Sequence, residues 1–202
     1  MLTPALSAYR PRTGSRASRE MQQSLWACLH DAGLTLLQSD LMLRTVTLTL
    51  EIEYLRRYAG LPVDTGWVLE SHEVTRVTAR TWLPWPGSAP DVHGLSREQE
   101  SMAIAEWQAK GRTTSLGWRD FEQAVADGGL WLSDADFSER DDAVVLTGCG
   151  NHQDNDRFFE FEIVAKRLNC RRTDGTELTV AALLELGNRY WDAFEKRTRP
   201  PD

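Results

Sequence analysis

The chain has 202 residues, of which 41% are hydrophobic and 26% are charged, and its formal net charge at pH 7 is −7. This composition is typical of a globular protein with one ample hydrophobic core, and it argues against a disordered or fibrous chain. Because no stretch approaches the roughly 18 consecutive apolar residues of a membrane-spanning helix, and the N-terminus lacks the apolar block of a secretory signal, we expect a cytoplasmic protein that does not enter a membrane.

The N-terminal part is expected to contain a flexible arm and one helix. Residues 1–17 are rich in arginine and broken by proline and glycine, which predicts a flexible basic arm. Ser18 then caps a predicted amphipathic helix, whose apolar residues recur at steps of three and four and which Gly33 ends. We expect residues 18–202 to form a single domain.

A group of strands is predicted next. Residues 44–54, RTVTLTLEIEY, alternate apolar and polar side chains, which predicts a strand with one face on the core. After a turn at 61–66, residues 67–83 favour one or two further strands, with a bulge expected at 72–74, where the alternation slips. The proline-rich loop 84–95 cannot form a helix or a central strand, and is the best candidate for a lobe boundary or a functional loop.

Two helices are predicted after this loop. Ser96 and Gln99 form a capping box that opens a helix running to Gly111. A second helix carries its large apolar residues on one side and ends at the glycine pair 128–129. A short strand at 130–132 and an acidic loop then follow.

The C-terminal part is expected to hold two strands and the best-defined helix of the chain. Residues 143–149 and 157–166 favour strands, and the apolar residues of 180–194 follow a three-four rhythm. Gly187 interrupts that apolar stripe at a cost of about 1 kcal/mol relative to alanine, so we expect a strand or an aromatic ring to approach it closely. Paired strands and grouped helices together predict an α+β fold, an antiparallel sheet packed on one face by helices that include a long amphipathic C-terminal one.

Cysteine and arginine usage bear on the compartment and the source. The three cysteines, Cys28, Cys149 and Cys170, are widely separated and form no C-x-x-C pair. That is neither a disulfide framework nor a zinc-site spacing, so we expect three reduced thiols. Arginine outnumbers lysine twenty to three, a bias that we take to indicate a bacterial or phage genome of high GC content.

The stretch TGCGNHQDNDRFFEFE, residues 147–162, concentrates potential metal ligands. Histidine and aspartate bind divalent cations, so one hypothesis is a metal-assisted hydrolase that uses His152, Asp154 and Asp156 with His72 or His93. The stronger interpretation is a turn between strands, because clusters of Asn, Asp and Gly are typical of such connections. The sequence lacks a calcium-loop pattern, an H-E-x-x-H motif and a phosphate-binding glycine loop, so we expect no cofactor.

Charge is the most informative feature. Between Asp120 and Glu162 there are twelve carboxylates and two arginines, a net charge of −10. Such a surface repels phosphate and membrane lipid and attracts a basic protein, although a charged loop that only aids solubility is the alternative. Nucleic acid is expected to bind weakly at most, through the arginines of the N-terminal arm.

The leading hypothesis is therefore a non-enzymatic factor that docks on a basic partner protein, as an inhibitor, immunity or anti-defence protein would. The predicted contact residues are seven carboxylates and two tryptophan anchors: Asp134, Asp136, Glu139, Asp141, Asp142, Glu160, Glu162, Trp82 and Trp85.

Overall fold

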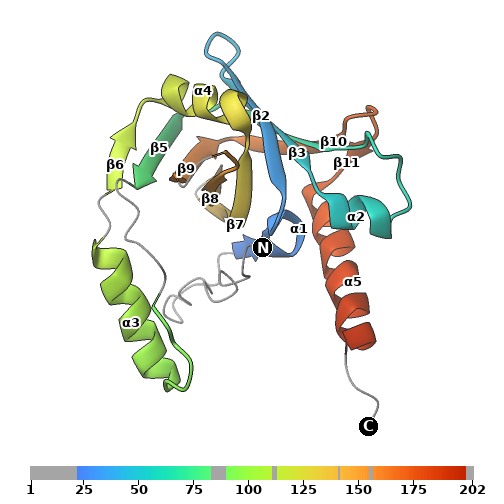
Figure 1. Cartoon of the computed structure of the whole chain (residues 1–202). Helices are drawn as coiled ribbons and strands as arrows, with labels where there is room; N and C mark the ends of the chain where they lie inside the picture. The colour runs from blue at the N-terminus through green and yellow to red at the C-terminus, as the bar shows by residue number, and fades with distance from the viewer. Residues whose placement is uncertain (1–21, 83–89, 111–112, 141, 155–156, 199–202) are drawn as a thin grey trace.

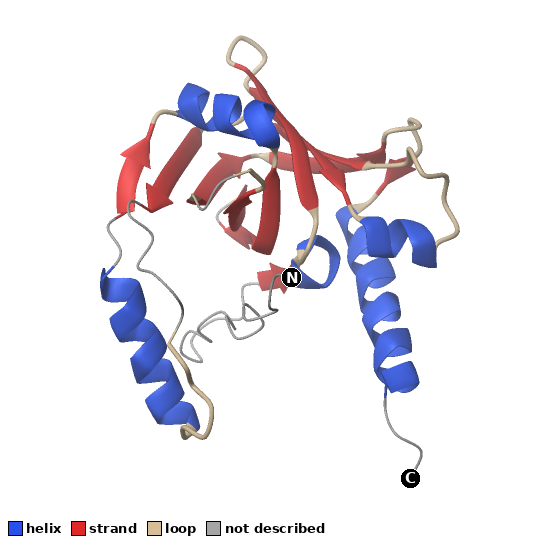
Figure 2. Ribbon diagram, viewed as in Figure 1, coloured by secondary structure: helices blue, strands red, loops and turns tan. Residues whose placement is uncertain are grey.

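The computed structural model describes residues 22–82, 90–110, 113–140, 142–154 and 157–198 (Figure 1). In these ranges the chain forms five helices and eleven strands, an α+β fold in which the sheet dominates (Figure 2). The helices are α1 (Trp26–Leu29), α2 (Glu53–Tyr58), α3 (Arg97–Lys110), α4 (Trp118–Gly128) and α5 (Val180–Thr198). The strands are β1 (Gln22–Ser24), β2 (Gly33–Asp40), β3 (Thr45–Glu51), β4 (Trp67–His72), β5 (Arg76–Trp82), β6 (Thr113–Leu116), β7 (Leu130–Arg140), β8 (Ala143–His152), β9 (Phe158–Ala165), β10 (Arg167–Arg172) and β11 (Glu177–Leu178).

All the strand pairs in the described ranges are antiparallel, and they form one sheet in the order β11-β10-β4-β3-β2-β7-β8-β9-β5-β6, with β1 on β7. Strand β4 pairs with β10, and β5 pairs with β9, in nearly continuous register. Because β4 leads into β5 and β9 leads into β10, these four strands make one long ribbon with a corner at residues 73–75. The ribbon joins β3 at one end and β8 at the other, so the sheet bends back around one core.

The corner coincides with residues 72–74, where the alternation of apolar and polar residues breaks in the sequence. A bulge was predicted there, and the structure has a turn between β4 and β5 instead. Glu73 adopts a left-handed φ of 53°, which ends β4 and turns the chain toward β5. The amide of Val74 then donates to the carbonyl of Arg44 at 2.9 Å, and the amide of Lys166 donates to the carbonyl of His72 at 3.0 Å. The corner is therefore tied to its neighbouring strands on both sides.

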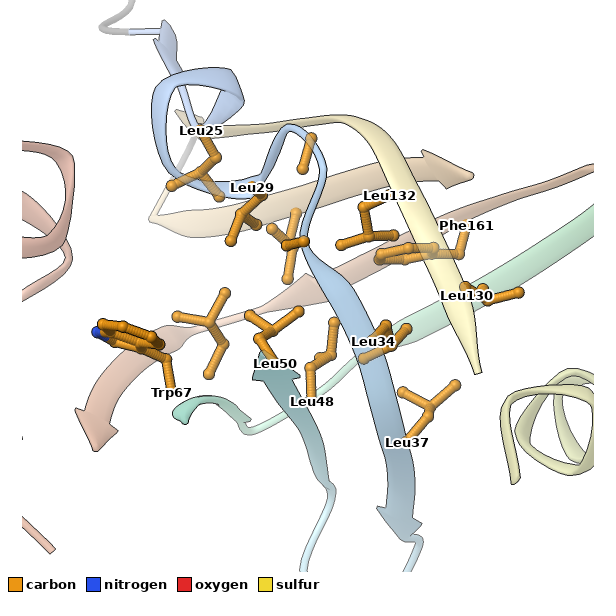
Figure 3. Close-up of a cluster of buried hydrophobic side chains, with 14 of the residues drawn as sticks. Leu25, Leu29, Leu34, Leu37, Leu48, Leu50, Trp67, Leu130, Leu132 and Phe161 are labelled. Atoms are coloured by element: carbon orange, nitrogen blue, oxygen red, sulfur yellow. The ribbon is translucent and has the colours of Figure 1, made fainter. Parts of the chain in front are cut away.

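The core lies between the two halves of this bent sheet (Figure 3). Strand β3 alternates as predicted, with Val46, Leu48 and Leu50 buried, and β9 buries Phe159, Phe161 and Ile163 in the same way. Burying one such side chain contributes about 1.5–3 kcal/mol. Gly148 of β8 makes room for this packing, because a Cβ there would lie 2.5 Å from the Phe161 ring.

The amphipathic helix predicted from Ser18 to Gly33 is not found in the described residues. From Gln22 the chain forms β1 and then the single turn of α1, and Gly33 begins β2 where a helix end was expected. Gly33 pairs with Glu51 on one side and with Trp131 on the other, so sheet pairing overrides the helical pattern. The apolar residues of the pattern that fall in the described ranges are nevertheless buried: Leu25, Cys28, Leu29 and Ala32.

The prediction of an acidic loop after residue 132 is also wrong, because most of this segment forms the second half of β7. A bulge between Leu132 and Asp134 shifts the alternation by one residue, so that Ala135 and Phe137 face the core. Aspartate is rare in strands, which hid this strand from the sequence pattern. Asp134 and Asp136 therefore lie on the outer face of the sheet. Strand β3 likewise ends at Glu51, before its predicted end, because α2 begins at Glu53.

The remaining helices agree with their predictions within the described ranges. The Ser96 amide donates to Gln99 Oε1 at 2.9 Å and the Gln99 amide to Ser96 Oγ at 3.3 Å, which is the predicted capping box of α3. Helix α4 buries Phe121 and Val125 and ends at Gly128, and Gly129, whose φ is 75°, caps it. No helix in the described ranges is both long and apolar enough to cross a lipid bilayer. The arm at 1–17 and much of the proline-rich loop 84–95 lie outside the described residues.

Helix α5 is anchored on the carbonyl of Ala27 in α1. Tyr54 Oη donates to this carbonyl at 3.3 Å and Trp191 Nε1 donates to it at 2.9 Å. A Cβ at Gly187 would lie 2.6 Å from the Ala27 oxygen and 2.7 Å from Cys28 Sγ. The close approach predicted at Gly187 is therefore confirmed, but the neighbour is α1, not a strand or an aromatic ring.

We expect Gly187→Ala to lower the free energy of unfolding by about 1–3 kcal/mol, because its new Cβ overlaps backbone atoms of α1. This loss would appear although alanine favours a helix over glycine by about 1 kcal/mol. Urea denaturation measures the change, and Asn188→Ala on the exposed side of α5 is the control. A Gly187→Ala protein as stable as the control would contradict the tight packing.

Candidate functional site

Four of the predicted contact residues lie on the outward face of the sheet: Asp134, Asp136, Glu160 and Glu162. Strand β8 lies between the two pairs, with Cys149 opposite Asp134 and Glu160, and Thr147 opposite Asp136 and Glu162. Residues directly opposite each other in an antiparallel pair point to the same side. These four carboxylates, with Cys149 and Thr147 between them, form what we call the acidic face.

Aromatic side chains border the acidic face in the next row of the register. This row contains Trp131, Asn151, Phe158 and Trp82. Trp82 Nε1 donates to Glu160 Oε1 at 3.2 Å, and its ring meets Phe158 edge to face at 6.5 Å between centroids. Trp131 is 46% exposed. We call Trp131, Phe158 and Trp82 the aromatic row. Trp131 and Phe158 were not predicted as contacts, and only the strand register reveals that they share a row with Trp82.

Strand β5 brings two arginines to the edge of the acidic face. Arg76 Nη2 pairs with Glu162 Oε1 at 2.7 Å, and Arg80 lies opposite Glu160 in the register. Both arginines are exposed. An exposed ion pair is worth less than about 1 kcal/mol, so a cation from a partner is able to replace Arg76 at little cost.

Asp134 is the most perturbed carboxylate of the acidic face. Its burial and the charge of Asp136 raise its pKa to about 6, although the backbone amide of Ala135 and His30 partly oppose the shift. The side chain is only 7% exposed, and its Oδ1 has no hydrogen-bond partner in the described part of the chain. A buried carboxylate with one oxygen that lacks a donor is costly to ionise. Asp134 is thus a group that a cation would stabilise.

Cys149, at the centre of the acidic face, is a protonated thiol at neutral pH. Burial and the carboxylates of Asp134 and Glu160 raise its pKa to about 12. All three cysteines of the chain are free. The thiolate is the form that attacks or binds metal, and this environment disfavours it at Cys149.

The other predicted contacts lie elsewhere or outside the described residues. Glu139 and Asp142 are exposed at the turn between β7 and β8, where Asp142 has a φ of 60°. Asp141 and Trp85 lie outside the described residues.

His152 is committed to the fold through both ring nitrogens. It is the last residue of β8 and is 8% exposed. The Asp154 amide donates to His152 Nδ1 at 3.1 Å, which places the ring proton on Nε2, and Nε2 donates to the Ala124 carbonyl at 3.0 Å. Metal binding would require breaking one of these bonds. His152 instead fastens the end of α4 to β8.

Of the other proposed metal ligands, Asp154 lies beside His152, because its amide donates to Nδ1 and both side chains adjoin Gly128. The remaining candidates in the described residues are not brought there. His72 lies near Glu70 at the corner of the ribbon, and His93 follows the exposed loop residue Asp91. Asp156 lies outside the described residues. In the part of the chain that the structure describes, no three His, Cys, Asp or Glu side chains are placed to hold a metal ion. Comparison with protein-family models, curated proteins and solved structures finds no match.

We expect Asp134→Asn to stabilise the protein at pH 7. The pKa of Asp134 is raised to about 6 from its usual 3.8. Between pH 3.8 and pH 6, the side chain is therefore protonated in the folded protein but ionised in the unfolded chain. Stability therefore falls as pH rises through this window, and the substitution should recover roughly 1–3 kcal/mol at pH 7. Urea denaturation between pH 4 and pH 8 measures this effect.

Exposed Asp192→Asn, on α5, is the control for this measurement, with an expected change within about 0.5 kcal/mol. At pH 4, where Asp134 is protonated in the folded protein, the two variants should behave alike. An equal gain for Asp134→Asn at both pH values would show that the buried charge is not its cause.

We expect His152→Ala to lower the free energy of unfolding by about 1–3 kcal/mol, because it leaves the Ala124 carbonyl without its donor. Exposed His93→Ala is the matched control and should change stability by less than about 0.5 kcal/mol. Thermal and urea unfolding measure both. Equal stability of the two variants would contradict a structural role for His152.

Proposed function

We propose that the acidic face and the aromatic row bind a basic segment of another protein. The chain would act without catalysis, as an inhibitor, immunity or anti-defence protein does when it occupies a basic surface of its target. The observation that carries the proposal is Asp134, a carboxylate buried beside Asp136 with one oxygen that lacks a hydrogen-bond partner in the described residues. A guanidinium or ammonium group bound at the neighbouring, more exposed carboxylates Asp136 and Glu160 would supply the opposite charge that this buried group lacks.

The spacing of the four carboxylates supports binding of several cations at once. Residues two apart on a strand are separated by about 7 Å, and residues on strands two apart by about 10 Å. The Debye length at physiological salt is about 8 Å, so neighbouring carboxylates on this grid reinforce one another. Phosphate groups would be repelled by the same field, which argues against a nucleic-acid ligand at this face.

The aromatic row favours arginine over lysine in the partner. A planar guanidinium stacks on a tryptophan ring and donates to a carboxylate in parallel bonds, whereas an ammonium acts as a point charge. Trp82 already holds Glu160 through its indole N–H, which fixes an aromatic ring beside a carboxylate. The exposed Trp131 offers a second ring at the other end of the row.

We expect a fluorescently labelled arginine-rich peptide to bind, and the double variant Glu160→Lys with Glu162→Lys to weaken that binding roughly tenfold or more at 150 mM salt. Fluorescence anisotropy measures the affinity. The control, Glu177→Lys with Glu185→Lys, makes the same change of net charge on β11 and α5. A lysine peptide of equal length should bind less tightly than the arginine peptide.

Two results would count against this assignment. Equal losses in both double variants would show that only the overall charge matters. Affinity that does not fall between 50 and 300 mM salt would show that the carboxylates do not drive binding.

A further inference from the structure

Three consecutive large apolar side chains are exposed at the end of the β2–β3 hairpin. Leu41, Met42 and Leu43 are 70%, 92% and 71% exposed. In Figure 1 this loop extends beyond α4 and the rest of the sheet. Large apolar groups that cluster on a surface usually mark an interaction site. We call these three residues the apolar tip.

The backbone of the apolar tip is held in one shape. Asp40 Oδ1 accepts hydrogen bonds from the amides of Met42 and Leu43, both at 2.9 Å. Arg44, which closes the loop, has a φ of 54°. Two hydrogen bonds to Val74 offset the energetic cost of this left-handed backbone conformation. Arg44 Nε donates to the Val74 carbonyl at 3.1 Å, and the Arg44 carbonyl accepts from the Val74 amide at 2.9 Å. The side chains are therefore presented outward on a fixed turn.

Positive charge lies beside the apolar tip. The side chains of Arg44, Lys166 and Arg167 are exposed. In the strand register, Arg167 lies opposite His72, and His72 lies opposite Thr45. Thr45 follows the loop directly, so these cations lie close to it. Glu73 pairs with Arg167 at 3.1 Å, so these two charges offset each other, and Asp40 caps the turn by accepting from backbone amides. Neither Arg44 nor Lys166 forms an ion pair within the described part of the chain.

We propose that the apolar tip binds a lipid surface, with Leu41, Met42 and Leu43 inserted below the headgroups and Arg44 and Lys166 against anionic headgroups. The combination of apolar side chains with flanking cations is that of interfacial membrane anchors. The bonds to Asp40 satisfy the amides of Met42 and Leu43, which an apolar layer requires.

A pocket on another protein fits the apolar tip less well. Anchors of protein interfaces are chiefly tryptophan, tyrosine and arginine, and leucine is under-represented among them. The tip is purely aliphatic apart from the Met42 thioether. Its three side chains also follow one another around a turn, where they spread over a surface more readily than they enter a single pocket.

The net charge of −7 does not prevent this contact at physiological salt. The Debye length there is about 8 Å, so distant carboxylates are screened while Arg44 and Lys166 meet the headgroups. Each such cation strengthens binding to an anionic bilayer about fivefold. The lipid contact is independent of the acidic face and of its proposed partner.

Vesicle flotation at 150 mM salt tests the proposal, with vesicles of phosphatidylcholine alone or mixed three to one with phosphatidylserine. We expect the wild-type chain to bind both, and the mixture roughly tenfold more tightly. Met42→Asp should lower binding at least tenfold on both. Lys166→Glu should abolish the preference for phosphatidylserine while binding to phosphatidylcholine persists. Val63→Asp, at another apolar side chain that is 79% exposed, should bind like the wild type.

Three results would overturn the proposal. The first is a wild-type chain that floats with neither vesicle. The second is an equal loss of binding in Met42→Asp and Val63→Asp, with circular dichroism showing both to be folded. The third is self-association of the wild-type chain that Met42→Asp removes, without binding to vesicles, which would assign the apolar tip to protein contact.

Discussion

The pairing of β2 with β7 holds the two halves of the structure together. It rests on two opposed residue pairs, Gly33 with Trp131 and Leu34 with Leu130. Through this short junction, β2 and β3 continue into β7 and β8, while the long ribbon of β4, β5, β9 and β10 joins the halves at the other side. A sheet bent in this way has a single interior, which the large apolar side chains fill. The outward-facing residues of β7, β8 and β9 thereby include Asp134, Asp136, Glu160 and Glu162.

This division between interior and exterior gathers the carboxylates. The bulge in β7 after Leu132 changes which residues face the core, and so places Asp134 and Asp136 on the same side as Glu160 and Glu162. Without that extra residue, the acids of β7 would point into an apolar interior at a prohibitive cost. The bulge thus reconciles a strand rich in aspartate with a tightly packed core, and it leaves Asp134 only partly solvated.

Sequence periodicity predicted the elements whose pattern is regular and local. The alternation of β3, the capping box of α3 and the apolar stripe of α5 each depend on neighbours in the sequence, and each is found. The errors fall where distant pairing decides the structure. Gly33 pairs with two strands, which replaces the predicted helix, and the aspartates of β7 are strand residues only because β8 pairs with them. The acidic residues were identifiable from composition, whereas only the register places Trp131 and Phe158 in one row with Trp82.

The raised pKa of Asp134 would make protons compete with the proposed cationic partner for the acidic face. One unit below its pKa of about 6, about nine in ten copies of this side chain are neutral. A cationic ligand that pairs with Asp134 must then expel that proton, so association and proton release are two sides of one equilibrium. Calorimetry in buffers of different ionisation enthalpy would register this exchange as a heat that depends on the buffer. A compartment that acidifies would favour dissociation without any change in the shape of the protein.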